Sequence, residues 1–481
     1  MDSIIGRKQQ KEDFGNLYRS KSAQFVVVYG RRRIGKSYLV NEFFNGRFAF
    51  NHSGLSPIDT EDTKILEKQL RSFASSLRKY GYDTDARTPK DWLEAFDMLI
   101  ELLESKMVGT DDKQVVFLDE LPWLDTPRSG FITAFEHFWN GWGASHRNLM
   151  LIVCGSATSW LNDKLINNHG GLFNRVTAEI YLEPFTLSEC EEYYKTLGIS
   201  MNRYQQTVAY MVFGGVPYYM SLMRKKFSLV QNIDFLIFDK RAPLRNEFDR
   251  LFESLFVSPD DYKKIAVTLS QKREGYTRKE IAQKTGIPYG GGLSKILNTL
   301  EVSNFVTSYQ NYKGNAKLTY YKLTDSFVSF YLQFGYKKNP GENFFADNFA
   351  SGRLSAWQGL AFEQVCFAHI RQIKRALGIA SVNTVEMPWR SLNADNNAQI
   401  DMVIERADQV ANICEIKFCM SDFCIDKDYD RNLRNKLQTF ITQTKSQLSL
   451  HLTLITTFGL KPNEYSGAVQ SVVTMDDLFA N

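Results

Sequence analysis

The sequence has few cysteines and no long apolar segment. Six cysteines occur in 481 residues, and no two have the C-x-x-C spacing, so neither a disulfide framework nor a zinc site is indicated. No window approaches the ~18 uncharged apolar residues that a membrane-spanning helix requires. The opening Met1–Asp13 is polar and lacks the apolar core of a signal peptide. We therefore expect a cytoplasmic protein with no membrane partner.

Charge is nearly balanced overall but unevenly distributed. The formal net charge is +4 for the whole chain. The segment Pro259–Asp325 holds eleven Lys or Arg and six Asp or Glu, a net charge of +5. The basic excess of the protein therefore lies in one segment, which bears on its partners.

The length and the spacing of apolar residues predict several domains. A chain of 481 residues is too long for one hydrophobic core. The first ~190 residues alternate short buried strands with helices, which is typical of a parallel α/β sheet. We expect strands at Phe25–Tyr29, Val115–Leu118 and Leu149–Cys154, and helices at Lys64–Lys79 and Trp92–Leu103. The predicted fold class is multidomain α/β.

Four domains are expected, at 1–188, 189–256, 257–335 and 345–481. The second is helical, with Leu187–Leu197 and Tyr204–Met223 interrupted at Gly214–Pro217. The fourth is a smaller α/β domain. Its expected elements are the helices Trp357–Ile373 and Asn432–Gln447 and the strands Gln399–Arg406, Asn412–Phe418 and Leu450–Thr456. Lys337–Asn343 is expected to be a linker or long loop.

The basic third domain has the element order of a winged helix. Helices are expected at Tyr262–Ser270, at Arg278–Lys284 and around Leu293–Leu300, followed by the strands Phe305–Gln310 and Leu318–Leu323. The turn Asn311–Lys317 would join these strands. Two uses remain open. One is DNA binding, in which the third helix enters a groove through exposed side chains, namely Ser294, Lys295, Asn298 and Thr299. The other is packing on the nucleotide module as a signalling element.

A phosphate-binding motif follows the first strand. Gly30–Ser37 fits G-x-x-x-x-G-K-[ST] at every fixed position, between the strand Phe25–Tyr29 and a helix expected at Tyr38–Phe44. Its glycines let backbone N–H groups surround phosphate oxygens, and the helix N-terminus adds positive charge. Lys36 would reach the β- and γ-phosphates, and Ser37 would offer its hydroxyl to Mg²⁺. The expected nucleotide-binding residues are Gly30, Arg31, Arg32, Arg33, Ile34, Gly35, Lys36, Ser37 and Tyr38.

Two further strands end in polar residues suited to the same site. Asp119 and Glu120 follow Val115–Leu118, where Asp119 would hold Mg²⁺ and Glu120 would orient or deprotonate the attacking water. Ser156 follows Leu149–Cys154 and would sense the γ-phosphate. The sequence therefore predicts hydrolysis of ATP with Mg²⁺.

These motifs resemble the archaeal-type ATPases of the AAA+/STAND group over roughly residues 1–330. The resemblance rests on Gly30–Ser37, on Asp119–Trp123 and on Cys154–Ser156. It implies that Gly6 and Arg7 lie beside the adenine and that Pro217 packs on the base. It also implies that Arg175 points toward phosphate. Whether Arg175 acts within its own subunit, across a contact in an ATP-dependent homo-oligomer, or only structurally is open.

A second acidic group lies near the C-terminus. The neighbouring strands around Asp401 and around Glu415 would form a hairpin, and alternation places Glu415 and Lys417 on one face. Grouped carboxylates bind Mg²⁺, and a nearby lysine can activate water for attack on a phosphodiester. Glu363 on the preceding helix is a further candidate ligand. An ordinary salt-bridged strand pair would have the same pattern.

The acidic group is similar to that of the PD-(D/E)XK nuclease superfamily, and to the C-terminal domain that often accompanies archaeal-type ATPases. This resemblance covers about 345–481 and implies Asp401, Glu415 and Lys417 as catalytic residues, with Glu363, Asp401 and Glu415 as metal ligands. Isoleucine precedes Asp401 where the superfamily name has proline. We therefore expect an ATP-driven switch that acts on DNA through a Mg²⁺-dependent nuclease-like domain. The alternative is a regulatory or scaffold ATPase whose C-terminal domain binds a partner and cuts nothing.

Overall fold

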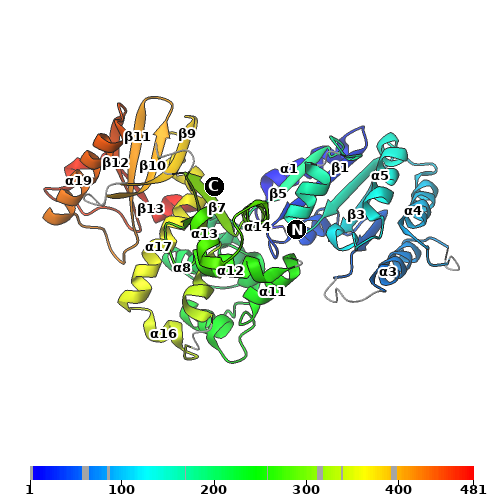
Figure 1. Ribbon diagram of the computed structural model, residues 1–481, viewed down its shortest axis with the longest axis horizontal. Coiled ribbons are helices and arrows are strands. Elements are labelled where there is room, and N and C mark those ends of the chain that lie inside the picture. The colour runs from blue at the N-terminus through cyan, green and yellow to red at the C-terminus, as the bar shows by residue number, and fades with distance from the viewer. Residues whose placement is uncertain are drawn as a thin grey trace. The chain divides into compact units, whose positions relative to one another are not determined.

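The chain folds into two compact units (Figure 1). The computed structural model describes residues 4–56, 64–83, 87–167, 170–256, 258–310, 312, 318–336, 340–391 and 398–480. The first unit comprises Met1–Pro184 with Glu253–Val257, and the second comprises Phe185–Phe252 with Ser258–Asn481. Within the described ranges, no helix is long and apolar enough to cross a membrane.

The first unit contains a five-stranded parallel sheet. Its strands, in spatial order, are β2 (Phe50–Ser53), β3 (Gln114–Asp119), β4 (Leu149–Cys154), β1 (Gln24–Gly30) and β5 (Ala178–Leu182). The three strands expected from the sequence, β1, β3 and β4, lie at the expected positions. A multidomain α/β fold with a parallel sheet is therefore confirmed.

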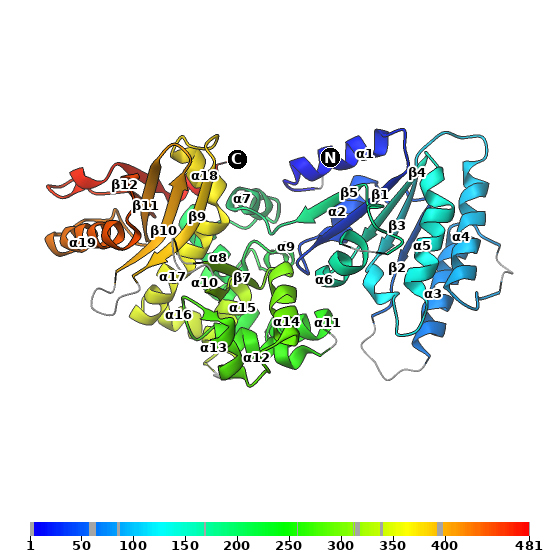
Figure 2. The ribbon, with the colours of Figure 1, turned by 45° about the horizontal axis from the view of Figure 1, so that its top comes forward.

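Helices cover both faces of this sheet. The longer helices of the unit are α1 (Lys8–Arg19), α2 (Lys36–Phe43), α3 (Ile65–Lys79), α4 (Trp92–Met107) and α5 (Phe131–Gly141), and the short α6 is Thr158–Leu161. Residues of α3, α4 and α5 share one apolar core, and residues of α1 and α2 share another. In Figure 2, α3, α4 and α5 lie on one side of the strands and α1 on the other.

The central strand β1 contributes alternate side chains to the two cores. Phe25 and Val27 pack in the core with α3–α5, whereas Val26 and Val28 pack in the core with α1 and α2. Successive side chains of a strand point to opposite faces, so a strand covered on both sides is apolar throughout. Strands β4 and β5 flank β1 in the sheet. Ligands of such sheets bind beyond the carboxyl end of a strand at a topological switch point, and Gly30–Ser37 lies there.

The second unit begins with helices that have clear start signals. They are α7 (Leu187–Thr196), α8 (Arg203–Phe213), α9 (Pro217–Ser221), α10 (Leu229–Ile233) and α11 (Glu247–Leu255), the last of which runs into the stretch Glu253–Val257. Thr186 and Asn202 form capping boxes that begin α7 and α8. Gly214 ends α8 with a φ of 65°, in the left-handed region that favours glycine. The predicted interruption at Gly214–Pro217 is confirmed.

Three helices and a small antiparallel sheet follow. The helices are α12 (Pro259–Leu269), α13 (Arg278–Thr285) and α14 (Gly291–Val302), and the strands, in spatial order, are β6 (Tyr276–Thr277), β8 (Thr319–Leu323) and β7 (Val306–Gln310). The sequence predicts two strands, and the structure adds the two-residue β6. Thr299 is expected to be exposed on the third helix, but it is buried, because its side chain faces α12 and hydrogen-bonds with that of Tyr262. The predicted turn Asn311–Lys317, except Tyr312, and residues 337–339 of the predicted linker lie outside the described residues.

The C-terminal part contains a mixed five-stranded sheet. Its strands, in spatial order, are β13 (Ser471–Thr474), β12 (Ser449–Thr456), β11 (Val410–Lys417), β10 (Gln399–Arg406) and β9 (Thr384–Arg390). The expected hairpin of β10 and β11 is antiparallel, and β11, β12 and β13 are parallel. The helices are α15 (Ser326–Phe330), α16 (Phe344–Asn348), α17 (Gly352–Ala368), α18 (Ile370–Ala376) and α19 (Lys427–Thr444).

Two helices of this part differ from expectation. The single helix expected over Trp357–Ile373 is divided at His369 into α17 and α18. The helix expected from Asn432 begins at Lys427, because the side chain of Asp426 accepts a hydrogen bond from the backbone N–H of Tyr429 at 2.8 Å.

Candidate functional site

The loop between β1 and α2 has the backbone of a phosphate cradle. Gly30 has a φ of 141° and Gly35 a φ of 88°, conformations that L-residues rarely adopt. A Cβ atom on Gly30 would lie 2.3 Å from the carbonyl oxygen of Leu182. The loop then leads directly into α2, and the first turn of a helix presents backbone N–H groups that have no acceptor within the helix itself. Anionic groups such as phosphate are the ligands that this arrangement favours.

Lys36 is buried at the start of α2. Its ammonium donates hydrogen bonds to the carbonyl oxygens of Gly30 and Arg31, both at 3.0 Å, and to Ser156 Oγ at 3.2 Å. Burial lowers the pKa of Lys36, because desolvation penalises the charged form, while Glu120 and Asp119 oppose this shift. The side chain therefore presents a desolvated cation inside the loop.

Ser37 and Asp119 bring two oxygen ligands together. Ser37 Oγ donates a hydrogen bond to Asp119 Oδ1 at 2.9 Å. Burial raises the pKa of Asp119. A hydroxyl and a carboxylate beside a phosphate cradle fit the hard oxygen donors that Mg²⁺ prefers. These two residues would hold the ion.

Glu120 is held against the end of β4. Ser156 donates to its carboxylate twice, from Oγ to Oε1 at 2.7 Å and from the backbone N–H to Oε2 at 3.0 Å. Glu120 has a φ of 46°, which turns its side chain away from the line of β3. A Cβ atom on the neighbouring Gly155 would lie 2.7 Å from Pro122 Cδ, so this approach of the two strand ends requires glycine.

The structure thus brings five sequence-predicted residues together at the carboxyl ends of β1, β3 and β4. They are Lys36, Ser37, Asp119, Glu120 and Ser156. Fully buried behind them is the thiol of Cys154, whose pKa is raised by burial. The arrangement can bind a polyphosphate and a cation. It can also place the carboxylate of Glu120 near the phosphate bond that hydrolysis would break.

The remaining loop residues frame this group. Arg7 is buried, and its guanidinium donates to the carbonyl oxygens of Glu183 at 2.7 Å and of Ile34 at 3.4 Å. It therefore fastens the loop to the end of β5. Gly6 and Arg7 both have a positive φ. Of the other predicted binding residues, Arg31 and Ile34 are buried, Arg32 and Arg33 are half-buried, and Tyr38 is exposed.

Two predicted residues lie outside this group. Arg175 is exposed shortly before β5, and its side chain makes no hydrogen bond or ion pair with another described residue. Pro217 begins α9 in the second unit, after Gly215, where a Cβ atom would lie 2.2 Å from the carbonyl oxygen of Phe185. Their predicted roles toward nucleotide stay predictions.

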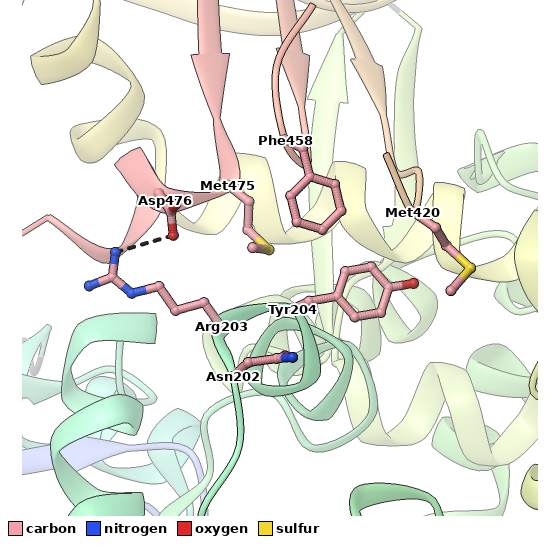
Figure 3. Close-up of a pocket in the computed structure, with 7 residues that line it drawn as sticks. All are labelled: Asn202, Arg203, Tyr204, Met420, Phe458, Met475 and Asp476. Atoms are coloured by element: carbon pink, nitrogen blue, oxygen red, sulfur yellow. Dashed lines mark hydrogen bonds and ion pairs between the residues drawn. The ribbon is translucent and has the colours of Figure 1, made fainter. Parts of the chain in front are cut away.

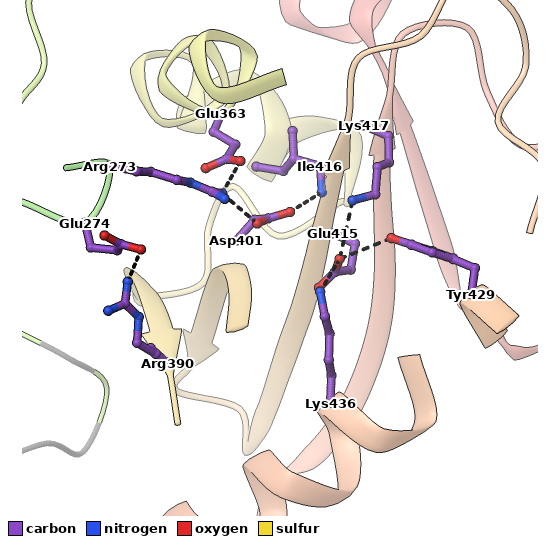
Figure 4. A network of polar contacts seen from close by, with 10 residues as sticks. All are labelled: Arg273, Glu274, Glu363, Arg390, Asp401, Glu415, Ile416, Lys417, Tyr429 and Lys436. Carbon is purple, nitrogen blue, oxygen red and sulfur yellow. Dashed lines mark hydrogen bonds and ion pairs between the residues drawn. The ribbon is translucent and has the colours of Figure 1, made fainter. Parts of the chain in front are cut away.

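The C-terminal carboxylates form a second network, shown in Figure 4. Glu363 of α17 and Asp401 of β10 both bind the same guanidinium, that of Arg273, which approaches Asp401 Oδ1 at 3.0 Å. Asp401 Oδ2 also accepts the backbone N–H of Ile416 at 3.0 Å. Burial raises the pKa of Glu363, and Asp401 adds to this shift.

Glu415 has a separate set of partners. Lys436 of α19 approaches its two oxygens at 2.7 and 2.8 Å, and the hydroxyl of Tyr429 donates to Oε2 at 3.2 Å. Lys417 lies 3.8 Å away on the same strand, as the alternation predicts. Burial raises the pKa of Glu415, with Asp401 as the next cause. In the described part of the chain, no group of three or more His, Cys, Asp or Glu side chains has an arrangement that could hold a metal ion.

Sequence reasoning missed three members of this network, Arg273, Tyr429 and Lys436. Tyr429 and Lys436 lie seven residues apart on α19, a spacing that places them on one helix face. Asp426 is a favourable cap residue, and recognising it as the start of α19 would have placed Tyr429 on that helix. No local signal pointed to Arg273, because its partners are 90 and 128 residues away in the chain.

The second unit also contains a hollow of about 440 Å³ near the carboxyl ends of β11, β12 and β13, shown in Figure 3. Tyr204 stacks on Phe418 with ring centroids 5.0 Å apart and on Phe458 at 6.0 Å. Arg203 pairs with Asp476 at 3.2 Å on the opposite side. The stacked rings on one side and the ion pair on the other join α8 to the residues that follow the strands, so the hollow lies at the junction between α8 and the sheet.

Comparison with known proteins finds similarity in the first part of the chain. Residues 6–223 match a family model described as an ATPase domain predominantly from Archaea. An uncharacterized protein of Methanocaldococcus jannaschii is 22% identical over 339 residues, which are 69% of this chain and 68% of that protein. The Walker-type ATPase of Pyrococcus abyssi is similar in structure, with 20% identity and a TM-score of 0.47 over 69% of this chain and 96% of that one.

The Aeropyrum pernix ORC2 protein, solved as ADPNP–ADP complexes, is also similar, with 13% identity and a TM-score of 0.40 over 72% of this chain and 96% of that one. The five-stranded parallel sheet and the loop at the end of β1 agree with the family match. The N-terminal part of this chain is therefore similar to an ATPase domain of archaeal type, and its loop Gly30–Ser37 has the P-loop sequence.

Proposed function

We propose that this protein is a switch that binds and hydrolyses ATP and acts on DNA through a nuclease-like C-terminal domain. In the first unit, Lys36 would contact the β- and γ-phosphates, and Ser37 and Asp119 would hold Mg²⁺. Glu120 would orient the attacking water, and Ser156 would sense the γ-phosphate. Gly6 and Arg7 would lie beside the adenine. Arg175 would reach phosphate within the subunit or across a homo-oligomeric contact.

One observation supports the nuclease part. Asp401 and Glu415 lie on paired antiparallel strands, and Lys417 lies 3.8 Å from Glu415 on the same face. Two carboxylates and a lysine in this order can hold Mg²⁺ and activate water for attack on a phosphodiester. Magnesium would supply Lewis acidity there, and Lys417 would hold or move the proton of the attacking water.

The basic segment supports DNA as the partner. The segment 257–335 would be a winged helix with α14 as its recognition helix. Lys295 and Asn298 are exposed on α14, while Ser294 is half-buried and accepts a hydrogen bond from Arg278 at 2.6 Å. Lysines near phosphates contribute sequence-independent affinity that falls with salt. Binding that weakens steeply with salt and is lost in Lys295→Glu would support this role.

A second candidate function is a regulatory ATPase whose C-terminal domain binds a partner without catalysis. The observation that favours it is the pairing of all three candidate carboxylates with a cation of the chain, Glu363 and Asp401 with Arg273, and Glu415 with Lys436. Buried ion pairs of this kind also occur as structural elements.

One assay separates the two candidates. The full-length protein is incubated with Mg²⁺ or Mn²⁺, with and without ATP, on linear, branched and single-stranded DNA. Cutting that is lost in Asp401→Ala and in Lys417→Ala, but kept in Asp408→Ala on the same hairpin, supports the nuclease. Absence of cutting on every substrate by the parent and by Arg273→Gln, which removes the cation paired with Asp401, with ATP hydrolysis intact, supports the regulatory function.

A further inference from the structure

Arg273 lies in a tight turn that holds it in place. The turn joins α12 to β6, and the backbone N–H of Gly275 donates to the carbonyl oxygen of Lys272 at 3.0 Å. Gly275 has a φ of 71°, and a Cβ atom there would lie 1.9 Å from the carbonyl oxygen of Tyr321. The turn therefore packs tightly on β8 and presents Arg273 in a fixed direction, toward the C-terminal sheet (Figure 4).

A single nitrogen of Arg273 bridges two buried carboxylates. Nη2 contacts both Glu363 Oε1 and Asp401 Oδ1. Glu363 and Asp401 are only 7% and 8% exposed, so their negative charges require a partner. A divalent cation bound by the same two oxygens would lie between them, where Nη2 now lies.

We propose that Arg273 occupies the cation position of the C-terminal carboxylate group and excludes divalent cations until the turn around Arg273 moves away. The inference rests on the proposed function, because it treats Glu363 and Asp401 as metal ligands. It adds a way in which metal binding at the nuclease-like site would be controlled. The segment with α12–α14 supplies the positive charge of Arg273 to that site and so keeps divalent cations out of it.

A neighbouring ion pair provides the matched control. Glu274, the next residue in the turn, pairs with Arg390 of β9, and its carbonyl oxygen accepts the hydroxyl of Tyr309 at 2.6 Å. Arg390→Gln therefore removes an ion pair between the same turn and the same sheet, but it leaves Arg273 with its two carboxylates.

The test is Mn²⁺ binding to the full-length protein without nucleotide, followed by the loss of the free-ion signal in electron paramagnetic resonance. Arg273→Gln is expected to bind one more Mn²⁺ than the parent, with affinity at least tenfold higher, and Arg273→Gln with Asp401→Asn is expected to lose that gain. Arg273→Lys keeps the charge and is expected to gain nothing. A folded Arg273→Gln variant that binds no more Mn²⁺ than the parent overturns the inference, as does an equal gain in Arg390→Gln.

A second measurement uses the parent protein, because Arg273→Gln leaves the two buried carboxylates with Lys322 as their nearby cation and without the guanidinium that bridges them. Millimolar Mn²⁺ should compete with Arg273 and increase hydrogen exchange in peptides covering 270–277, and this increase should be absent in Asp401→Asn. Unchanged exchange in the parent counts against the inference.

DNA cutting then separates the inference from the proposed function. Cutting by Arg273→Gln but not by the parent supports both. Extra Mn²⁺ binding without cutting supports the role of Arg273 and rules out nuclease activity of the C-terminal domain. Mn²⁺-dependent cutting by the parent, unchanged in Arg273→Gln, supports the nuclease and overturns the role of Arg273.

Discussion

His369 lies at the break between α17 and α18 and joins distant parts of the second unit. It is fully buried, and its Nδ1–H donates to the carbonyl oxygen of Val365 at 2.8 Å. With the proton on Nδ1, Nε2 accepts the backbone N–H of Leu187 at 2.9 Å. If Nε2 were protonated, its N–H and the backbone N–H of Leu187 would both be donors and would repel each other. Burial accordingly lowers the pKa of His369 to about 4.

This shift makes the second unit sensitive to acid. The folded pKa lies below the unfolded value, so the stability that neutral His369 contributes is complete above pH ~6.5 and is lost as pH falls toward 4. Each pKa unit of difference corresponds to about 1.4 kcal/mol. The free energy of unfolding should therefore fall by about 2 kcal/mol from this group between pH 7 and pH 5, and by about 3 kcal/mol at pH 4.

The comparison is between the parent and His369→Gln, whose amide oxygen can still accept the N–H of Leu187. Urea unfolding at pH 7 and pH 5 is followed by hydrogen exchange of peptides from α7 and α17, which report on the second unit. The variant should show a pH dependence smaller by about 2 kcal/mol. His451→Gln, a half-buried histidine of the same unit, is the control. Equal pH dependence in His369→Gln and the parent would refute the assignment.

Two further predictions concern the two candidate sites. Gly30→Ala should reduce nucleotide binding more than tenfold in a fluorescent ATP titration, because the new Cβ would meet the carbonyl oxygen of Leu182 at 2.3 Å. Gly46→Ala, with a φ of 65° and open space around it, carries the backbone strain without that clash and should bind normally. Lys436→Met should lower the free energy of unfolding by about 3 kcal/mol in urea, since Glu415 would remain buried without its main partner. A change below about 0.5 kcal/mol would show that Glu415 does not depend on this pair.

Periodicity and cap residues located many elements of the fold. The strands β1, β3 and β4 are continuous apolar runs because both faces of the sheet are covered, and the sequence marks them clearly. Helix α13 begins at its predicted residue because Thr277 and Glu280 form a capping box. Strand β2, Phe50–Ser53, has only four residues of mixed polarity and is defined by its pairing with β3. The residues of such a strand do not by themselves predict it from the sequence.

The candidate sites differ in how far the sequence could predict them. The P-loop residues adjoin strand ends, so their grouping follows from the order of a parallel sheet. Asp401 and Glu415 adjoin through one hairpin and were predicted on the same basis. Arg273 reaches Asp401 only through tertiary packing, and neither periodicity nor turn chemistry encodes that contact. His369, at the break between α17 and α18, likewise has a partner far away in the chain, the backbone N–H of Leu187.

The most direct test of the account is ATP binding and hydrolysis by the full-length parent, Lys36→Ala and Glu120→Gln. Binding is measured with a fluorescent ATP analogue and hydrolysis by phosphate release with Mg²⁺. We predict that Lys36→Ala loses binding, because the buried ammonium is removed from the loop. Glu120→Gln should bind ATP like the parent but hydrolyse it at least a hundredfold more slowly. A Lys36→Ala protein that binds and hydrolyses ATP like the parent would contradict the assignment of this site.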